Sequence, residues 1–162
     1  MSLTQPTKKI IIVGAGNVAK ALLFEINKAK IGCEVEIYNR TLVKAEALKD
    51  TFNFVKTVKS LSNISEAQGD VFVNLTHIGG RVTNEIFPEV VINRFEHVVD
   101  VTFENEQTDL IKKSLKLGKK IATGWDMFAY QAQVCIEGIL NKTVEYDVLK
   151  KHVVAGLSET IK

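Results

Sequence analysis

The chain has 162 residues and a mass of 18.0 kDa, the size of one ordinary domain. Apolar residues make up 46% and charged residues 25%, so the composition excludes a disordered chain, a collagen-like repeat and a coiled coil. The formal net charge is only +2, with both signs mixed along the chain, which argues against a dedicated binder of nucleic acid or of a membrane surface.

Two further features concern the compartment and metal binding. No apolar run reaches the roughly 20 residues that span a bilayer, and the first nine residues lack the pattern of a signal peptide. Cys33 and Cys135 stand apart, without the spacing of a zinc site or a redox motif. We therefore expect two buried free thiols, no metal site and a reducing, cytoplasmic environment.

The first half of the chain alternates short apolar runs with helical patterns. Residues 10–13 form a continuous apolar run typical of a strand buried on both faces, and a helical pattern follows until Gly32. Residues 33–38 alternate with period two and predict a half-exposed strand. We then expect a helix over residues 41–50, a short strand over 54–58 and a helical turn over 62–67.

The second half continues in the same way. We expect a buried strand at residues 71–73, a loop at 79–80, a short helical segment broken by Pro88, strands at 97–101 and 120–122, and helices at 108–117, 127–140 and 144–157. This order predicts an α/β fold, a Rossmann-type doubly wound and mostly parallel sheet with helices on both faces. We assign residues 1–8 to an N-terminal tail or an expression remnant, and residues 9–162 to a single NAD(P)-binding domain.

A glycine-rich turn follows the first predicted strand and opens the first helix. Its five leading residues are Gly14, Ala15, Gly16, Asn17 and Val18, and Ala19 completes the pattern G-x-G-x-x-A. The first glycine permits a tight turn, the second lets the backbone approach a pyrophosphate, and the small sixth residue allows close helix–strand packing. The helix N-terminus adds free N–H groups for phosphates. The motif predicts dinucleotide binding, the alternative being a turn that needs glycine only for packing.

The end of the second predicted strand indicates which dinucleotide is bound. Domains that bind NAD usually carry a carboxylate there, bonded to the ribose 2′-hydroxyl. Here the strand ends in Asn39, Arg40 and Thr41, with Lys44 one turn later, and Glu36 lies inside the strand. The planar Arg40 fork suits a 2′-phosphate, which favours NADP over NAD. The alternative is that Arg40 is a solvated surface charge and Thr41 only a helix cap.

With these motifs, the chain resembles the C-terminal cofactor-binding domain of shikimate dehydrogenases, over residues 9–138. The phosphate loop and the Asn39-Arg40-Thr41 turn match that family most specifically. Residues 70–79, the aspartate at position 100 with residues 108–110, and the segment from Gly124 to Gln131 match further. The resemblance implies NADP-dependent interconversion of 3-dehydroshikimate and shikimate, or a related hydroxy acid, in the biosynthesis of aromatic amino acids.

The resemblance also implies roles for individual residues. The turn from Gly14 to Val18 would hold the pyrophosphate, and the four residues Asn39, Arg40, Thr41 and Lys44 would hold the adenosine phosphate. Thr76, Val101 and Gly124 would lie along the nicotinamide, while Gln131 and Phe103 would face a small hydroxy-acid substrate. For Gln131, the alternative is a polar residue at a buried helix start that is satisfied by the backbone.

Several positions depart from the family pattern. Phe103 replaces a tyrosine and removes a hydroxyl near the substrate, Asn105 replaces a proline, and Asp126 replaces a glycine beside the nicotinamide. Asp126 has the simpler interpretation of a cap for the following helix. His77 stands where the family has a small residue or proline, and it is either a new acid–base group or a plain loop histidine.

The largest departure is that no counterpart of the family's N-terminal substrate domain, with its lysine and aspartate, precedes the cofactor domain. We therefore identify no catalytic residue, and we expect the isolated chain to be inactive unless a substrate domain or partner chain completes it. The alternative function is a non-enzymatic NADP-binding module that acts as a redox sensor or subunit. A homodimer is a further arrangement to consider. Other enzymes with similar Asn-Arg-Thr turns fit residues 124–131 less well.

Overall fold

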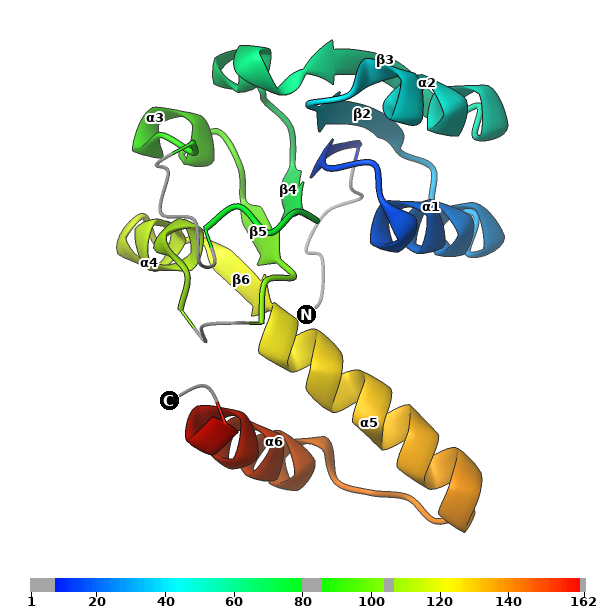
Figure 1. Cartoon of the computed structure of the whole chain (residues 1–162), viewed down its shortest axis with the longest axis vertical. Helices are drawn as coiled ribbons and strands as arrows, with labels where there is room; N and C mark the ends of the chain where they lie inside the picture. Colours follow the sequence, from blue (N-terminus) through cyan, green and yellow to red (C-terminus); the bar gives the residue numbers. More distant parts are fainter. Residues whose placement is uncertain (1–7, 80–85, 104–106, 161–162) are drawn as a thin grey trace.

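The computed structural model describes residues 8–79, 86–103 and 107–160 (Figure 1). Within these residues the chain forms one parallel sheet from six strands, namely β1 (Lys9–Val13), β2 (Glu34–Asn39), β3 (Val55–Ser60), β4 (Val71–Asn74), β5 (His97–Asp100) and β6 (Lys120–Thr123). The strand order is β3-β2-β1-β4-β5-β6, so the direction of winding reverses between β1 and β4. This arrangement confirms the predicted Rossmann-type fold, and it fixes the switch point at the ends of β1 and β4.

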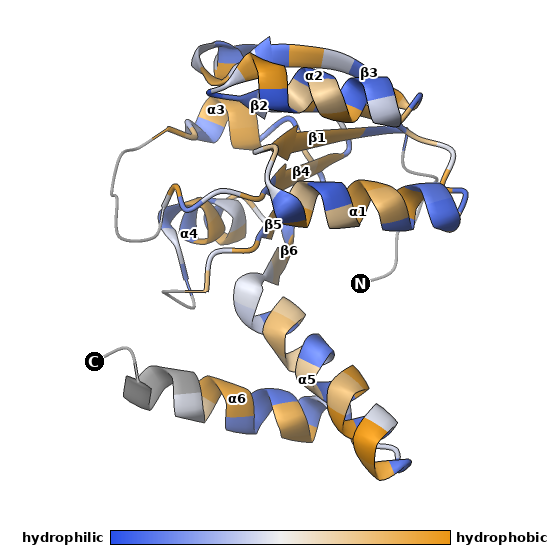
Figure 2. Cartoon of the chain, turned by 45° about the vertical axis from the view of Figure 1, so that its right-hand side comes forward, coloured by the Kyte–Doolittle hydropathy of each residue, from blue (hydrophilic) through white to orange (hydrophobic). Residues whose placement is uncertain are grey.

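Helices cover both faces of the sheet. In chain order they are α1 (Asn17–Lys28), α2 (Leu42–Thr51), the 3-10 helix η1 (Leu61–Glu66), α3 (Glu89–Ile92), α4 (Asp109–Lys116), α5 (Gly124–Leu140) and α6 (Tyr146–Thr160). One face is covered by α1 and α2, and the other by η1, α3 and α4. Helices α5 and α6 form an antiparallel hairpin that projects from the β6 edge (Figures 1 and 2).

The core follows from the alternation of side chains along the buried strands. On β1, Ile10 and Ile12 pack beneath α1 and α2, whereas Ile11 and Val13 pack on the other side with η1, α3 and α4. A continuous apolar run is therefore required, since both faces of β1 are covered. The run places the glycine turn, which follows Val13 directly, at the carboxyl edge of the sheet.

Several sequence predictions differ from the structure in detail. The second strand is not half-exposed, because Glu36 is buried between two lysines, as described below. Cys33 is buried as predicted, but Cys135 is exposed on α5, a helix that projects from the sheet (Figure 1). Pro88 does not break a helix but precedes α3 as its N-cap residue.

Helix α5 begins at Gly124 rather than at residue 127, since Thr123 and Asp126 form a capping box one turn earlier than expected. Asp126 is thus the third helical residue of this box and not the N-cap itself. Among the described residues, no helix is long and apolar enough to cross a membrane. The predictions for residues 1–7, Gly80 and Asn105 lie outside the described residues.

Candidate functional site

The glycine turn lies between the end of β1 and the start of α1. Gly14 adopts φ +108°, a left-handed conformation, and its N–H donates to the Tyr38 carbonyl at 2.9 Å. A Cβ at this position would lie 2.9 Å from Thr76 Cγ2 and 3.1 Å from the Leu75 carbonyl oxygen. Both the conformation and the packing against the end of β4 therefore require glycine here.

Gly16 differs from Gly14 because nothing in the described part of the chain crowds it. It is the N-cap residue of α1, and a Cβ built on it would meet no atom within 4 Å. No side chain caps α1, and its first turn holds no acidic residue, so neither a hydroxyl nor a carboxylate occupies the helix N-terminus. The open space and the partial positive charge suit an anionic group that closely approaches the backbone.

The cationic residues after β2 lie exposed beside this turn. The Asn39 side chain donates to the Thr41 carbonyl at 2.7 Å and shapes the turn. Arg40 and Lys44 are exposed, and no carboxylate in the described part of the chain pairs with Arg40. Thr41 is the N-cap residue of α2, but its side chain makes no capping bond. The positive charges of Arg40 and Lys44 therefore remain available to a ligand.

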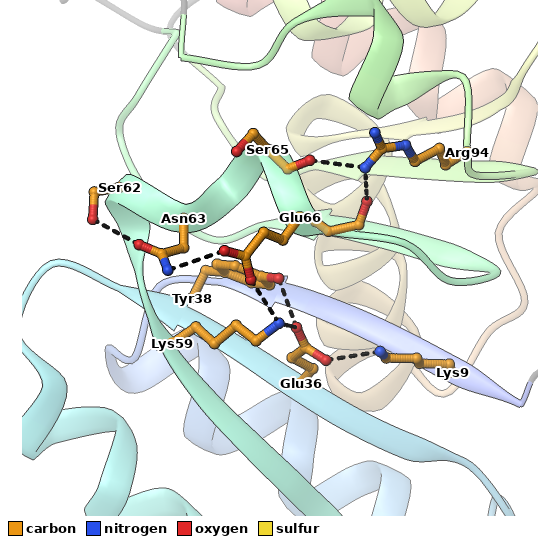
Figure 3. Close-up of polar contacts among 10 residues, drawn as sticks. Lys9, Glu36, Tyr38, Lys59, Ser62, Asn63, Ser65, Glu66 and Arg94 are labelled. Carbon is orange, nitrogen blue, oxygen red and sulfur yellow. Dashed lines mark hydrogen bonds and ion pairs between the residues drawn. The ribbon is translucent and has the colours of Figure 1, made fainter.

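Glu36, the carboxylate of β2, belongs to a separate network on the η1 side of the sheet (Figure 3). Its carboxylate lies 2.7 Å from Lys9 Nζ and 3.2 Å from Lys59 Nζ, and it accepts a hydrogen bond from the Tyr38 hydroxyl at 2.6 Å. Burial alone would raise the pKa of Glu36, but the hydrogen bonds from Lys9, Tyr38 and Lys59 outweigh burial and lower it. Glu36 is only 6% exposed, so it cannot serve a ribose at the strand end.

The other half of the carboxyl edge is a network of buried polar side chains. The Asn74 amide donates to Asp100 Oδ1 at 3.1 Å, and the Thr108 hydroxyl donates to Asp100 Oδ2 at 2.6 Å. The Thr102 N–H also donates to Asp100, while the Thr76 hydroxyl donates to Asn74 Oδ1 at 2.7 Å. Burial raises the pKa of Asp100, and these hydrogen bonds oppose it only in part. The network ties the ends of β4 and β5 to the start of α4.

Gly124 brings α5 directly against the end of β5. A Cβ at Gly124 would lie 2.5 Å from the Val101 carbonyl oxygen and 2.7 Å from that of Thr102. The Thr102 hydroxyl donates to the Thr76 carbonyl at 3.2 Å, which links this point back to β4. Of the residues predicted to line the nicotinamide, Thr76, Val101 and Gly124 thus lie along one continuous edge that begins at Gly14.

The two residues predicted to face a substrate are less enclosed. Phe103 is half-exposed, and its carbonyl accepts a hydrogen bond from Trp125 Nε1 at 2.7 Å. Gln131 is exposed on the second turn of α5. Asp126 is held away from this region, since its carboxylate pairs with Lys150 and accepts a hydrogen bond from the Tyr146 hydroxyl at 3.2 Å. His77 is exposed in the loop after β4.

A hollow of about 640 Å³ lies away from the residues described so far. It is bordered by residues at the amino-terminal edge of the sheet and the end of α1, among them Lys8, Lys30, Cys33 and Phe54. It is wide open to solvent, and none of its lining residues belongs to the glycine turn or to the Arg40 turn. We therefore place the candidate site at the carboxyl edge, on the chemistry of its groups. No cluster of three or more potential metal ligands occurs among the described residues.

Sequence reasoning missed part of this edge. Thr102 was not expected to take part, and no local pattern marks it, because its partners are reached only across the sheet. The capping box of Thr123 and Asp126 did have a local signal, the spacing T-x-x-D before an apolar run.

Known proteins resemble this chain in sequence and in structure. The model of the family "Shikimate / quinate 5-dehydrogenase" matches residues 2–103. The shikimate dehydrogenase (NADP(+)) of Methanocaldococcus jannaschii is 29% identical in an alignment that covers 94% of this chain and 56% of the relative. The chain spans about half the length of the curated relatives it matches.

Two solved structures of shikimate and quinate dehydrogenases have a similar fold. A shikimate dehydrogenase in complex with NADP+ is 26% identical with a TM-score of 0.77, and the match covers 94% of this chain and 56% of that one. A quinate dehydrogenase from Corynebacterium glutamicum in complex with NAD shares the fold at 19% identity and a TM-score of 0.80, over 94% of this chain and 56% of that one. The glycine turn, the strand order and the family match together show that this chain belongs to the shikimate/quinate 5-dehydrogenase family.

Proposed function

We propose that residues 9–162 form the NADP-binding domain of a shikimate dehydrogenase-like oxidoreductase. The observation that carries this proposal is the pairing of two features at one edge of the sheet. Gly16 leaves open space above a helix N-terminus that no side chain caps, and the guanidinium of Arg40, which pairs with no carboxylate among the described residues, lies at the end of the neighbouring strand. The protein's own packing explains Gly14 but not Gly16, whereas a bound pyrophosphate explains both.

The phosphates and the adenosine end would be held by the first half of the edge. The backbone from Gly14 to Val18 would donate to the pyrophosphate, and Arg40, with Asn39, Thr41 and Lys44, would bind the 2′-phosphate. A charge-assisted hydrogen bond from an arginine contributes about 1.5–3 kcal/mol, which is enough to set a preference for NADP over NAD. The relative of known structure bound to NADP+ supports this choice.

The nicotinamide end would lie along Thr76, Val101 and Gly124. When bound there, a reduced nicotinamide would supply the hydride for reduction of a ketone carbon, and an acid would have to protonate the ketone oxygen. We propose a ketone such as 3-dehydroshikimate, which would be reduced to shikimate or a related hydroxy acid, with Gln131 and Phe103 beside it. The protein's part here is to position the ring and to exclude water along the hydrogen-bonded ends of β4 and β5.

The two buried or paired aspartates at this edge do not supply the acid–base group. Asp100 is 1% exposed and accepts three hydrogen bonds, and Asp126 is paired with Lys150, so neither faces a substrate. We propose that a substrate domain, on this polypeptide or on a partner chain, supplies the base and the wall that orients the substrate. Such a base usually contributes a factor of about a hundred to ten thousand. The reaction would take place in the cytoplasm.

A stand-alone NADP-binding module is the second candidate function. The observation in its favour is the state of Phe103 and Asp126, since one has no hydroxyl to offer and the other is engaged within the α5–α6 hairpin. In that role, the chain would bind NADPH and report the redox state without turnover, whatever substrate domain is added.

One set of titrations tests both functions. Trp125 is the single tryptophan and follows Gly124, which we place beside the nicotinamide, so energy transfer from Trp125 to the reduced nicotinamide would report binding. We expect NADPH to bind more tightly than NADH, and we expect no useful oxidation of shikimate with NADP by the chain alone. Turnover after addition of a family substrate domain supports the enzyme, whereas persistent inactivity favours the binding module. Appreciable turnover by the chain alone, abolished in His77→Ala, would make His77 the base and refute this assignment.

A further inference from the structure

Asn74, the last residue of β4, uses the full hydrogen-bonding capacity of its side chain inside the protein. The residue is completely buried. Its amide nitrogen donates to Asp100 Oδ1 at 3.1 Å and to the Ile78 carbonyl at 3.0 Å, and its amide oxygen accepts from the N–H and the hydroxyl of Thr76 at 3.2 Å and 2.7 Å. A primary amide offers two donors and two acceptor positions, so all four are engaged.

These bonds determine the path of the loop that follows β4, residues 75–78. The Thr76 hydroxyl donates to Asn74 and also accepts from the Ile78 N–H at 3.1 Å. Asn74 therefore engages the Ile78 carbonyl directly and the Ile78 N–H through Thr76. Because both backbone polar groups of Ile78 depend on one buried side chain, the loss of that side chain should loosen the loop.

Asp100, on the neighbouring strand β5, sets the orientation of the Asn74 amide. Oδ1 of Asp100 accepts from Asn74 and, at 3.1 Å, from the Thr102 N–H, while Oδ2 accepts from the Thr108 hydroxyl at 2.6 Å. A carboxylate only accepts hydrogen bonds, so it faces the nitrogen of the amide and directs the amide oxygen toward Thr76. The position of β5 thus determines how Asn74 contacts the loop after β4.

The loop lies against the glycine turn to which the proposed function assigns the pyrophosphate. A Cβ at Gly14 would lie 2.9 Å from Thr76 Cγ2, and the Thr102 hydroxyl donates to the Thr76 carbonyl at 3.2 Å. Thr76 therefore lies between the ends of β1 and β5, where we place the nicotinamide end of the cofactor.

We propose that Asn74 is a positioning residue for the cofactor: bonded to Asp100, it fixes residues 75–78 and so places Thr76 beside the nicotinamide. This inference rests on the proposed function and deepens it. Asn74 is 0% exposed, so it does not touch the cofactor itself. Any effect of its substitution on binding must therefore pass through the residues that it holds in place.

Calorimetric titration with two ligands tests the proposal. NADPH carries the nicotinamide, whereas adenosine 2′,5′-bisphosphate carries the adenosine phosphates without it. In Asn74→Ala, the affinity for NADPH should fall by about tenfold or more, because binding must then also order the loop. The affinity for adenosine 2′,5′-bisphosphate should stay within about twofold of the wild-type value, since Arg40 and the start of α1 are unchanged. A general loss of structure would weaken both ligands alike.

Ser114→Ala is the matched control. Ser114 is also 0% exposed, and its hydroxyl donates to the Leu110 carbonyl at 2.7 Å within α4, away from the loop. This change should leave both affinities as they are. Amide hydrogen exchange without any ligand gives a second measurement, because peptides that cover residues 75–79 should exchange faster in Asn74→Ala than in Ser114→Ala or the wild type. If Asn74→Ala does not fold, Asn74→Ser retains a smaller polar group, and the same results are expected for it.

The outcomes separate this inference from the proposed function. A wild type that binds neither ligand would refute the proposed function and this inference with it. If the wild type binds both ligands, then three results would refute only the role of Asn74. These are an unchanged NADPH affinity in the Asn74 variant, equal losses for the two ligands, and unchanged hydrogen exchange of residues 75–79.

Discussion

The two halves of the carboxyl edge are built differently. Around β1 and β2, no side chain caps α1, and Arg40 forms no ion pair in the described part of the chain. Around β4 and β5, Asn74, Asp100 and Thr108 satisfy one another below the surface. Donors without a protein partner are typical of a surface that binds a ligand. Buried polar side chains that satisfy one another's hydrogen bonds are typical of a rigid structural region. The half around β1 and β2 therefore carries the phosphate site that we propose, whereas the Asp100 carboxylate of the other half is engaged by its neighbours.

Gly16→Val should give the largest effect, because its side chain would enter the space left for the pyrophosphate. We expect the affinity for both NADPH and NADH to fall by at least about a hundredfold, while the melting temperature changes little, since no atom of the described residues lies within 4 Å of the new Cβ. Gly32→Val is the matched control, because its Cβ also meets nothing within 4 Å. Normal NADPH binding by Gly16→Val would mean that the phosphates lie elsewhere.

Arg40→Ala tests whether the turn after β2 determines which cofactor is bound. The loss of a charged hydrogen bond should weaken NADPH binding by about ten- to a hundredfold and leave NADH nearly unchanged. Lys49→Ala, at an exposed lysine in the last turn of α2, should alter neither affinity. Equal losses for the two cofactors would contradict the role given to Arg40.

Glu36→Gln tests whether the buried acid of β2 serves stability rather than binding. The change removes the charge that Lys9 and Lys59 share, and it should lower the free energy of unfolding by about 2 kcal/mol at neutral pH. Because the folded-state pKa of Glu36 is lowered, its stabilisation is present above the unfolded pKa and is lost as the pH falls through the folded value. Urea unfolding at several pH values measures this, and a changed ratio of NADPH to NADH affinity would argue against a purely structural role.

Asp100→Asn should give the smallest effect at neutral pH and a pH dependence of the opposite sign. The folded-state pKa of Asp100 is raised, so the wild type loses stability as the pH rises from the unfolded pKa to the folded value. The asparagine removes this loss while it keeps an oxygen for Asn74 and for the Thr102 N–H, so the net change should stay below about 1 kcal/mol. Unfolding curves at acidic and neutral pH compare the two proteins. A decrease in the free energy of unfolding as large as that of Glu36→Gln would show that the carboxylate charge of Asp100 itself stabilises the ends of β4 and β5.

The sequence predicted the elements that depend on neighbouring residues. The apolar run of β1, the glycines at positions 14 and 16 and the order of strands and helices are local patterns, and they led to the correct fold. Helix ends were less accurate, as at α5, where the capping box of Thr123 and Asp126 sets the start. The residues of the Arg40 turn were also visible, because the turn lies next to a predicted strand end.

Only the tertiary structure decided which side chains are buried and which form ion pairs or hydrogen bonds with distant residues. Glu36 is buried because Lys9 and Lys59 come from the two strands on either side of β2, and Asp100 is saturated by Asn74, 26 residues away. Cys135 is exposed because α5 leaves the sheet after its first turns (Figure 1). The physical reason is that local preferences depend on adjacent residues, whereas burial and the pairing of charges depend on groups that meet only when the sheet has formed.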